Sequence, residues 1–335
     1  MLSGLYFCTM NFKNQLKSIL MKKIFLSFTE VLFCISIVAQ NSVNLKLNLE
    51  KNKVYRLNAV SAQTIIQTVN GNQQTIESNT SYTASVKMID ATADFMIAEV
   101  HFDSLITKTN TMGITMNISS VREGDIKSAK NDEVMSYIMN RLCKNTLYTK
   151  IDFSGKVLDI VNAKMLSDLV LKDTSSITLT GPAASAIKTQ LINLVSDKSL
   201  KTMVGMFTHF LPGKQVSPGD NWSVTENTNS GGMSLEIITG YHLDGVNGDV
   251  ANVTAESDIK AAANSAPMIA NGATITYDDI KGLSKSKMMI DTRTGLIMST
   301  TAKTHIAANL GVSGPGFSMQ IPMDISGDAK VIALN

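Results

Sequence analysis

The chain has 335 residues, of which 44% are hydrophobic, and its 30 basic and 28 acidic side chains give a formal net charge of +2. This balance argues against nucleic acid as a partner, because nucleic-acid binding needs a concentrated basic face. Three cysteines are too few for a disulfide-stapled fold, so a chain of this length must rely on a hydrophobic core.

The first 40 residues have the pattern of a processed leader. A basic start at Met21, followed by an apolar run that ends at Ala39, predicts a secretory signal peptide over residues 21–40. Residues 1–20 are then an upstream extension from a start codon placed too early. The leader holds four lysines and one glutamate, so its removal changes the net charge from +2 to −1.

Export makes the expected location periplasmic or extracellular, with no transmembrane span in the mature chain. A retained membrane anchor is one alternative, but the apolar run is shorter than the roughly 20 residues that a spanning helix needs. A lipid anchor on Cys34 is another, although bulky Phe33 stands where lipoprotein signals carry a small residue. Cys143 is the only mature thiol, which leaves no internal disulfide.

Residues 41–130 are expected to be rich in strands. Apolar and polar residues alternate from residue 43 to residue 49, as they do in a half-buried strand. Asn70-Gly71 predicts a hairpin turn before a long strand over residues 75–89, because both residue types tolerate the positive φ angles that tight turns need. Further strands are expected over residues 95–107 and 114–121, in an antiparallel meander.

Residues 131–213 are expected to be helical or of mixed secondary structure. Asp132-Glu133 opens a predicted helix, and Asn162 is expected to cap a short one. Residues 181–195 and 197–211 repeat apolar positions at helical spacing, with Ser196 as the cap between them. Pro212-Gly213 should end this central helical segment.

Residues 214–335 return to the strand pattern after a turn that delivers Trp222 into the first strand. Asp278-Asp279 is expected to be a turn, and residues 311–316 a flexible connection. The expected strands cover residues 233–243, 250–259, 273–279, 282–291, 295–308, 317–325 and 329–334.

Two segments, residues 151–158 and 290–297, share a strand, an aspartate, a turn that ends in glycine and a second strand. The simpler interpretation is that aspartate and glycine suit hairpins. A duplicated half of the chain is the alternative.

These elements predict one α+β domain over residues 41–335. Its expected core element is a large curved antiparallel sheet, like half of a barrel, that packs on the central helical segment, because such a sheet must bury one face.

The sequence predicts no catalytic residue, no metal site and no cofactor. None of the four histidines has a paired metal spacing, and His101 with Asp103 provides only two ligands. Cys143 lies on the apolar side of its predicted helix, where a thiol is inert. No phosphate-binding or dinucleotide-binding glycine motif is present.

Methionines are frequent in the second half of the chain, and flexible thioethers can line an adaptable apolar cavity. Together with the single tryptophan and a helix phenylalanine they are our candidates for a ligand cavity. The candidates are Met203, Phe207, Trp222, Met233, Met289 and Met298.

The turn from Leu211 to Trp222 has the pattern Pro-x-x-x-Val-x-x-Gly-Asp-x-Trp, and it resembles a family of uncharacterised exported proteins of Bacteroidota, a domain of unknown function. The resemblance implies a secreted or periplasmic protein and no known activity. The order of elements is also similar to the half-barrels of periplasmic lipoprotein carriers, although the N-terminal helix of those carriers has no counterpart here. That second resemblance is one of fold alone.

We therefore expect a non-enzymatic binding protein for a lipid or other apolar ligand. An envelope scaffold or protein-interaction module, with an envelope protein as partner, is the first alternative. A hydrolase is the second alternative, and it rests only on loops and isolated acidic residues.

Overall fold

Long antiparallel strands dominate the computed structural model, which describes residues 42–178, 188, 191–208, 210–230, 233–263, 267–270 and 273–334. The strands are β1 (Val43–Leu45), β2 (Val54–Val69), β3 (Asn72–Ala91), β4 (Phe95–Thr111), β5 (Ile114–Ser119), β6 (Leu147–Asp152), β7 (Val157–Ile160), β8 (Lys214–Val216), β9 (Asn221–Ser230), β10 (Met233–Asn247), β11 (Val250–Ala261), β12 (Met268–Ala270), β13 (Ala273–Asp291), β14 (Ile297–Gly314) and β15 (Phe317–Leu334).

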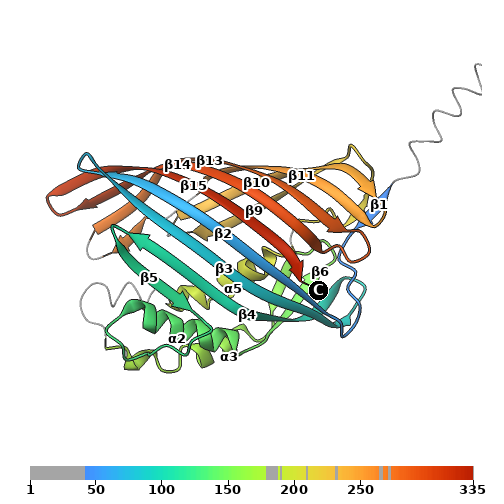
Figure 1. The fold of residues 1–335 in the computed structure, drawn as a ribbon, viewed down its shortest axis with the longest axis horizontal. Helices are drawn as coiled ribbons and strands as arrows, with labels where there is room; N and C mark the ends of the chain where they lie inside the picture. The colour runs from blue at the N-terminus through green and yellow to red at the C-terminus, as the bar shows by residue number, and fades with distance from the viewer. Residues whose placement is uncertain are drawn as a thin grey trace, which may run out of the picture. The chain divides into compact units, whose positions relative to one another are not determined.

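Thirteen of these strands form a single open sheet with the order β7-β6-β4-β3-β2-β15-β14-β13-β11-β10-β9. Strand β5 adds to β4, β12 adds to β13, and β1 pairs with β8 in a separate ribbon. All strand pairs among the described residues are antiparallel, and β2 from the start of the sheet pairs with β15 from its end in the middle of the strand order (Figure 1). The expected antiparallel sheet is confirmed, but the fold is β-rich rather than a balanced α+β fold.

Local turn chemistry explains where the strands begin and bend. Asn70 and Gly71 both have positive φ, of 50° and 79°, which confirms the predicted hairpin between β2 and β3. The predicted turn at Asp278-Asp279 is wrong, because β13 continues through it with a register shift and a φ of 50° at Asp279. The predicted loop over residues 311–316 is also mostly strand, since β14 runs to Gly314.

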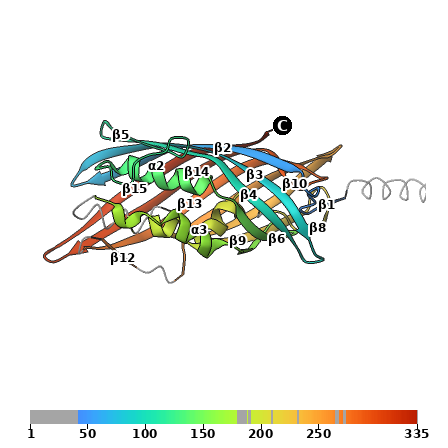
Figure 2. The ribbon, with the colours of Figure 1, turned by 90° about the horizontal axis from the view of Figure 1, so that it is seen from below.

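Helices α2 (Asn131–Cys143), α3 (Ala163–Val170) and α5 (Asp197–Gly205) lie across one side of the sheet (Figure 2). Helix α2 buries Val134 and Ile138 completely, because a spacing of four residues places both on one face. A short 3₁₀ turn, η1 (Thr174–Ser176), follows α3.

Two helix caps were predicted, and one is confirmed. The Ser196 hydroxyl oxygen accepts a hydrogen bond from the backbone N–H of Ser199 at 3.3 Å, and α5 begins directly after it. Asn162 precedes α3, but its side chain instead accepts from the Tyr148 N–H at 2.9 Å and donates to the Thr146 carbonyl at 2.8 Å. Most of the helix predicted over residues 181–195 lies outside the described residues.

Residues 45–48, which we call the N-terminal strap, bind the two hairpins that the sequence singled out. The Leu47 N–H donates to the carbonyl of Phe153 at 2.9 Å, and the Asn48 N–H donates to the carbonyl of Thr294 at 2.9 Å. The strap also contacts Gly213, at the expected end of the central helical segment. The Gly213 N–H donates to the Leu45 carbonyl at 3.1 Å. The similar hairpins therefore share a partner.

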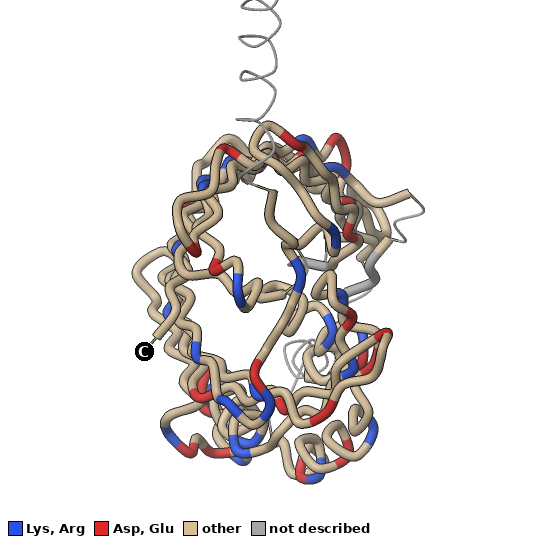
Figure 3. The backbone as a smooth tube through the Cα atoms, turned by 90° about the vertical axis from the view of Figure 1, so that its right-hand side faces the viewer, with Lys and Arg blue, Asp and Glu red and all other residues tan. Residues whose placement is uncertain are grey.

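The main hydrophobic core lies between the helices and one face of the sheet, which we call the inner face. Leu200 and Val204 of α5 are buried in one cluster with Ala59 of β2, Val253 of β11 and Met288 of β13. Successive strand residues alternate between the faces, so register extends this assignment along each strand. The unit from Val43 to Asn335 is compact, and its sheet curves round when viewed from one end (Figure 3).

A second hydrophobic cluster occupies the other end of the inner face. The uninterrupted register of β11 places Ile259 on the same face as Val253. The buried members of this second cluster are Leu235, Ile259, Ile280, Ile306, Ala308 and Ile325.

Candidate functional site

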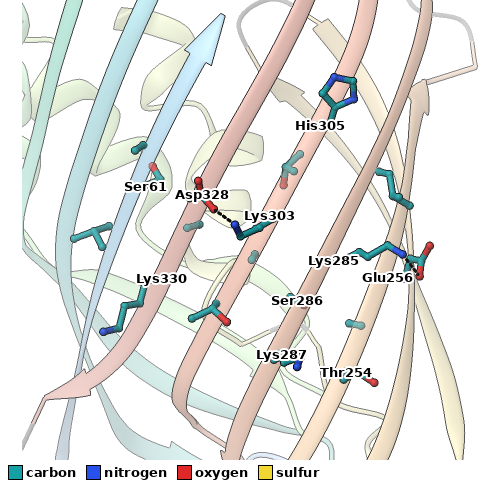
Figure 4. Close-up of a pocket in the computed structure, with 18 of the residues that line it drawn as sticks. Ser61, Thr254, Glu256, Lys285, Ser286, Lys287, Lys303, His305, Asp328 and Lys330 are labelled. Carbon is teal, nitrogen blue, oxygen red and sulfur yellow. Dashed lines mark ion pairs between the residues drawn. The ribbon is translucent and has the colours of Figure 1, made fainter.

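A cavity of about 1850 Å³ contacts nine strands that follow one another in the sheet, from β4 to β9. A single cavity can contact so many neighbouring strands only from the side towards which the sheet curls. The cavity therefore lies on the inner face, and Figure 4 shows part of its wall.

Small side chains form the centre of this wall. Ser286 pairs with Ala302, Ala302 with Ala329, and Ala329 with Ser61, so these residues lie side by side across four strands. The full set, which we call the small-residue row, is Ala255, Ser286, Ala302, Ala329, Ser61 and Thr80. Because none of these side chains is large, the inner face stays open between the two hydrophobic clusters.

Two stacked aromatic rings close the β9 end of the row. The rings of Trp222 and Tyr241 lie 5.4 Å apart with an interplanar angle of 7°. The Trp222 Nε1–H donates to the carbonyl of Phe210 at 2.9 Å, which fixes the indole. Burial, and to a lesser degree the charge of Glu226, raises the pKa of Tyr241 to about 12, so its hydroxyl is protonated at neutral pH.

A second row of polar residues separates the small-residue row from the second hydrophobic cluster. Ser284 and Thr304 share a hydrogen bond of 2.8 Å between their hydroxyls, and Thr239 and Ser257 share one of 2.9 Å. The register continues this row across eight strands as Thr239, Ser257, Ser284, Thr304, Gly327, Gln63, Ser78 and Thr109. We call it the hydroxyl row, because six of these eight residues are serine or threonine.

Charged side chains occupy the outer face of the same strands. Lys303 lies 3.6 Å from Asp328, and Lys285 lies 3.5 Å from Glu256, as the dashed lines in Figure 4 mark. In β2, β3, β4, β10, β11, β13, β14 and β15, the described residues that the register places on the inner face include none with a charge. Exposed Glu226 shares that face on edge strand β9.

Of the cavity residues that the sequence suggested, Trp222 lines the cavity. Met203 packs against the main core, and Phe207 is buried there with its ring edge-on to Tyr82 at 5.4 Å, and neither lines the cavity. Met289 and Met298 are 41% and 40% exposed, and they do not line it either.

Met233 is the first residue of β10, and the structure does not describe its side chain. The small-residue row could not be predicted from the sequence, because each of its six members lies on a different strand. Only the register brings them together.

Two groups outside the cavity, Asp103 and Cys143, have shifted pKa values. On the outer face, Asp103 accepts hydrogen bonds from His101 at 3.0 Å and Arg56 at 2.7 Å. Partial burial raises the pKa of Asp103, but the bonds from His101 and Arg56 outweigh it and hold the pKa below its usual value. Burial raises the pKa of the Cys143 thiol, which favours the unreactive form. No three potential metal ligands gather in the described part of the chain.

One buried hydroxyl beside the small-residue row predicts a stabilising substitution. Thr300 pairs with Val331 and Met288, and its Oγ1 is buried without a hydrogen-bond partner among the described residues. Thr300→Val keeps the shape and removes the unsatisfied group, so we expect the free energy of unfolding to rise by about 1 kcal/mol. Urea unfolding measures this change.

Thr80→Val is the matched control for Thr300→Val. The Thr80 hydroxyl lies 3.2 Å from the Thr107 hydroxyl, so its removal should lower the free energy of unfolding by about 1 kcal/mol. Equal losses in the two variants would contradict the prediction.

The sequence matches a family of unknown function, DUF6263, over residues 93–297. The chain belongs to this family. The matched segment includes the turn motif that ends at Trp222 and most of the strands that line the cavity. The origin among exported proteins of Bacteroidota stays a prediction.

Comparison with solved structures gives distant likenesses only. An outer membrane channel from Pseudomonas putida F1 is 8% identical, with 86% of this chain and 97% of that chain covered and a TM-score of 0.23. OccK7 (OpdD) of Pseudomonas aeruginosa is 8% identical, with 84% and 99% covered and a TM-score of 0.22. The translocator domain of the autotransporter NalP from Neisseria meningitidis is 7% identical, with 85% and 90% covered and a TM-score of 0.19.

TM-scores this low do not establish a shared fold or function. A comparison with curated proteins finds no match. Within the described ranges, no helix is both long and apolar enough to cross a bilayer.

Proposed function

We propose that this DUF6263 protein is a non-enzymatic binding protein that holds a lipid or other apolar ligand inside its curved sheet. The observation that carries the proposal is the cavity of about 1850 Å³ on the inner face. Ligand sites for drug-sized molecules typically measure about 300–1000 Å³. A cavity of this size suits a larger ligand with one or more long apolar parts.

The chemistry of the wall supports an apolar ligand. The main core lies beside the small-residue row, and the stacked Trp222 and Tyr241 rings offer a flat apolar surface at one end. Long-chain or ring systems gain free energy by leaving water for such a surface.

We also propose that the protein is exported, with the signal peptide over residues 21–40 removed, to the periplasm or the extracellular space. A location outside the cytoplasm suits a carrier that takes up ligand from an envelope. The proposal rests on the charge and hydrophobicity pattern of the leader.

An interaction module for an envelope protein is the second candidate. The sheet is open, and among the described residues its outermost strands β7 and β9 each pair on one side only. An added strand from a partner could extend either edge.

Native mass spectrometry tests the binding function. The protein is expressed with its leader, purified from the envelope fraction, weighed under native conditions and weighed again after denaturation and organic extraction. We expect the polypeptide mass of a chain that begins near Asn41. We also expect additional mass under native conditions, from a bound ligand that the organic solvent extracts. A bare polypeptide mass, together with no uptake of added hexadecane, would overturn the binding function and favour the interaction module.

A further inference from the structure

The cavity wall places polar groups of one kind against the ligand. Ser61, Thr80, Ser286 and Thr304 all line the cavity, and each carries a hydroxyl. A hydroxyl offers one donor and two acceptor positions, so it can bind an alcohol, an ester carbonyl or an amide. The wall can therefore form hydrogen bonds with a neutral polar group, but it offers no charge to balance an ion.

The charged side chains that border the cavity point away from it. Lys285, Lys303, Glu256 and Asp328 also border the cavity, but strand alternation directs their side chains to the outer face, where they pair with one another. A carboxylate or phosphate inside the cavity would meet no opposite charge from the eight strands β2, β3, β4, β10, β11, β13, β14 and β15. Burial of an unpaired ion costs far more than burial of a hydrogen-bonded neutral group.

We propose that the ligand is an uncharged lipid whose hydroxyl or ester groups bind the hydroxyls of Ser61, Ser286 and Thr304. This inference rests on the proposed binding function and names the class of ligand. The polar group lies at the small-residue and hydroxyl rows, and the apolar chains extend from there past Trp222. A neutral diacylglycerol has this chemistry, whereas a fatty acid anion or a phosphatidate does not.

Thr304 is the best position at which to test the hydrogen bond between ligand and wall. It belongs to the hydroxyl row and lines the cavity, and its Oγ1 lies 2.8 Å from the Ser284 hydroxyl. That bond uses one of the hydroxyl's three positions, so the others can serve a ligand. Valine at this position keeps the shape and removes the polar group.

The test compares four probes on the delipidated protein, with the fluorescence of Trp222 as the signal, since Trp222 is the only tryptophan and lines the cavity. The probes are dioleoylglycerol, oleate, dioleoylphosphatidate and hexadecane. At neutral pH we expect dioleoylglycerol to bind at least about tenfold more tightly than either anion. Acidification below the carboxyl pKa of oleate should strengthen oleate binding, because the neutral acid loses the charge penalty.

Thr304→Val should weaken dioleoylglycerol binding by about threefold to tenfold, the value of one neutral hydrogen bond, and leave hexadecane binding unchanged. Thr225→Val is the control, because Thr225 is exposed on the outer side of β9 and does not line the cavity. Urea unfolding establishes that both variants are folded at the assay temperature.

The outcomes separate this inference from the function on which it rests. Failure of all four probes to bind would overturn both. Equal binding of oleate and dioleoylglycerol at neutral pH, or equal loss of dioleoylglycerol and hexadecane binding in Thr304→Val, would overturn the neutral ligand alone and leave an apolar carrier.

Discussion

Replacing Gly295 by alanine is expected to lower the free energy of unfolding by about 3 kcal/mol or more. Gly295 has a φ of 74°, a conformation that costs an L-residue roughly 1–2 kcal/mol. A Cβ at this position would also lie 2.3 Å from the carbonyl oxygen of Lys46 in the N-terminal strap. Because that oxygen belongs to backbone, the strap must move, and the bond from Asn48 to Thr294 is strained with it. The midpoint of urea unfolding measures the loss.

Gly316→Ala is the matched control. Gly316 has a similar φ of 83°, but a Cβ there would meet nothing within 4 Å. This variant should lose only the conformational term, roughly 1–2 kcal/mol. The difference between the two variants isolates the contact between hairpin and strap, and equal losses would show that this contact contributes no stability.

The two similar hairpins share a contact with the strap that their sequences do not reveal. Aspartate and glycine in residues 151–158 and 290–297 were attributed to turn chemistry, and the structure agrees, since Asp152 Oδ1 accepts from the Ser154 N–H and Asp291 Oδ1 from the Arg293 N–H. Their shared role in binding the strap depends on contacts between residues far apart in sequence. Turn chemistry is local, and the strap contact is not.

The same distinction separates the features of the fold that could be predicted from those that could not. The Asn70-Gly71 hairpin and the Ser196 cap follow from the conformations that single residues favour, and both are confirmed. The pairing of β2 with β15 joins residues more than 250 positions apart, and no local pattern encodes it. The register shift at Asp278-Asp279 looked like a turn because aspartate is common in turns, and it also tolerates the positive φ that Asp279 adopts within β13.

The candidate cavity also depends on contacts between residues far apart in sequence. Methionine frequency directed attention to flexible side chains, yet the open space arises where side chains are small. Ala302 and Ala329 are unremarkable in sequence, and their importance follows from a register that places them side by side on the inner face. Trp222 lines the cavity because the register pairs it with Tyr241, next to the small-residue row, and local sequence predicted only the turn that precedes it.

Filling the small-residue row is expected to weaken ligand binding strongly without loss of stability. The double variant Ala302→Phe with Ala329→Phe places two rings side by side on neighbouring strands, inside the cavity. We expect the affinity for hexadecane and for dioleoylglycerol to fall by at least about tenfold, measured by Trp222 fluorescence. The rings displace the ligand because both seek the same apolar surface.

The unfolding free energy of this double variant decides whether the space is open. In a solidly packed core, added side-chain volume typically costs about 1–3 kcal/mol at each site. In a cavity of about 1850 Å³ the two rings instead bury apolar surface that was open, so stability should hold or rise. The control places phenylalanine at Ala307 and Ser326, which are exposed on the outer face of the same two strands, and it should bind both ligands as the parent protein does. Lost binding with a loss of several kcal/mol would point to a misfolded sheet, whereas lost binding with stability retained requires that ligand and aromatic rings compete for one space.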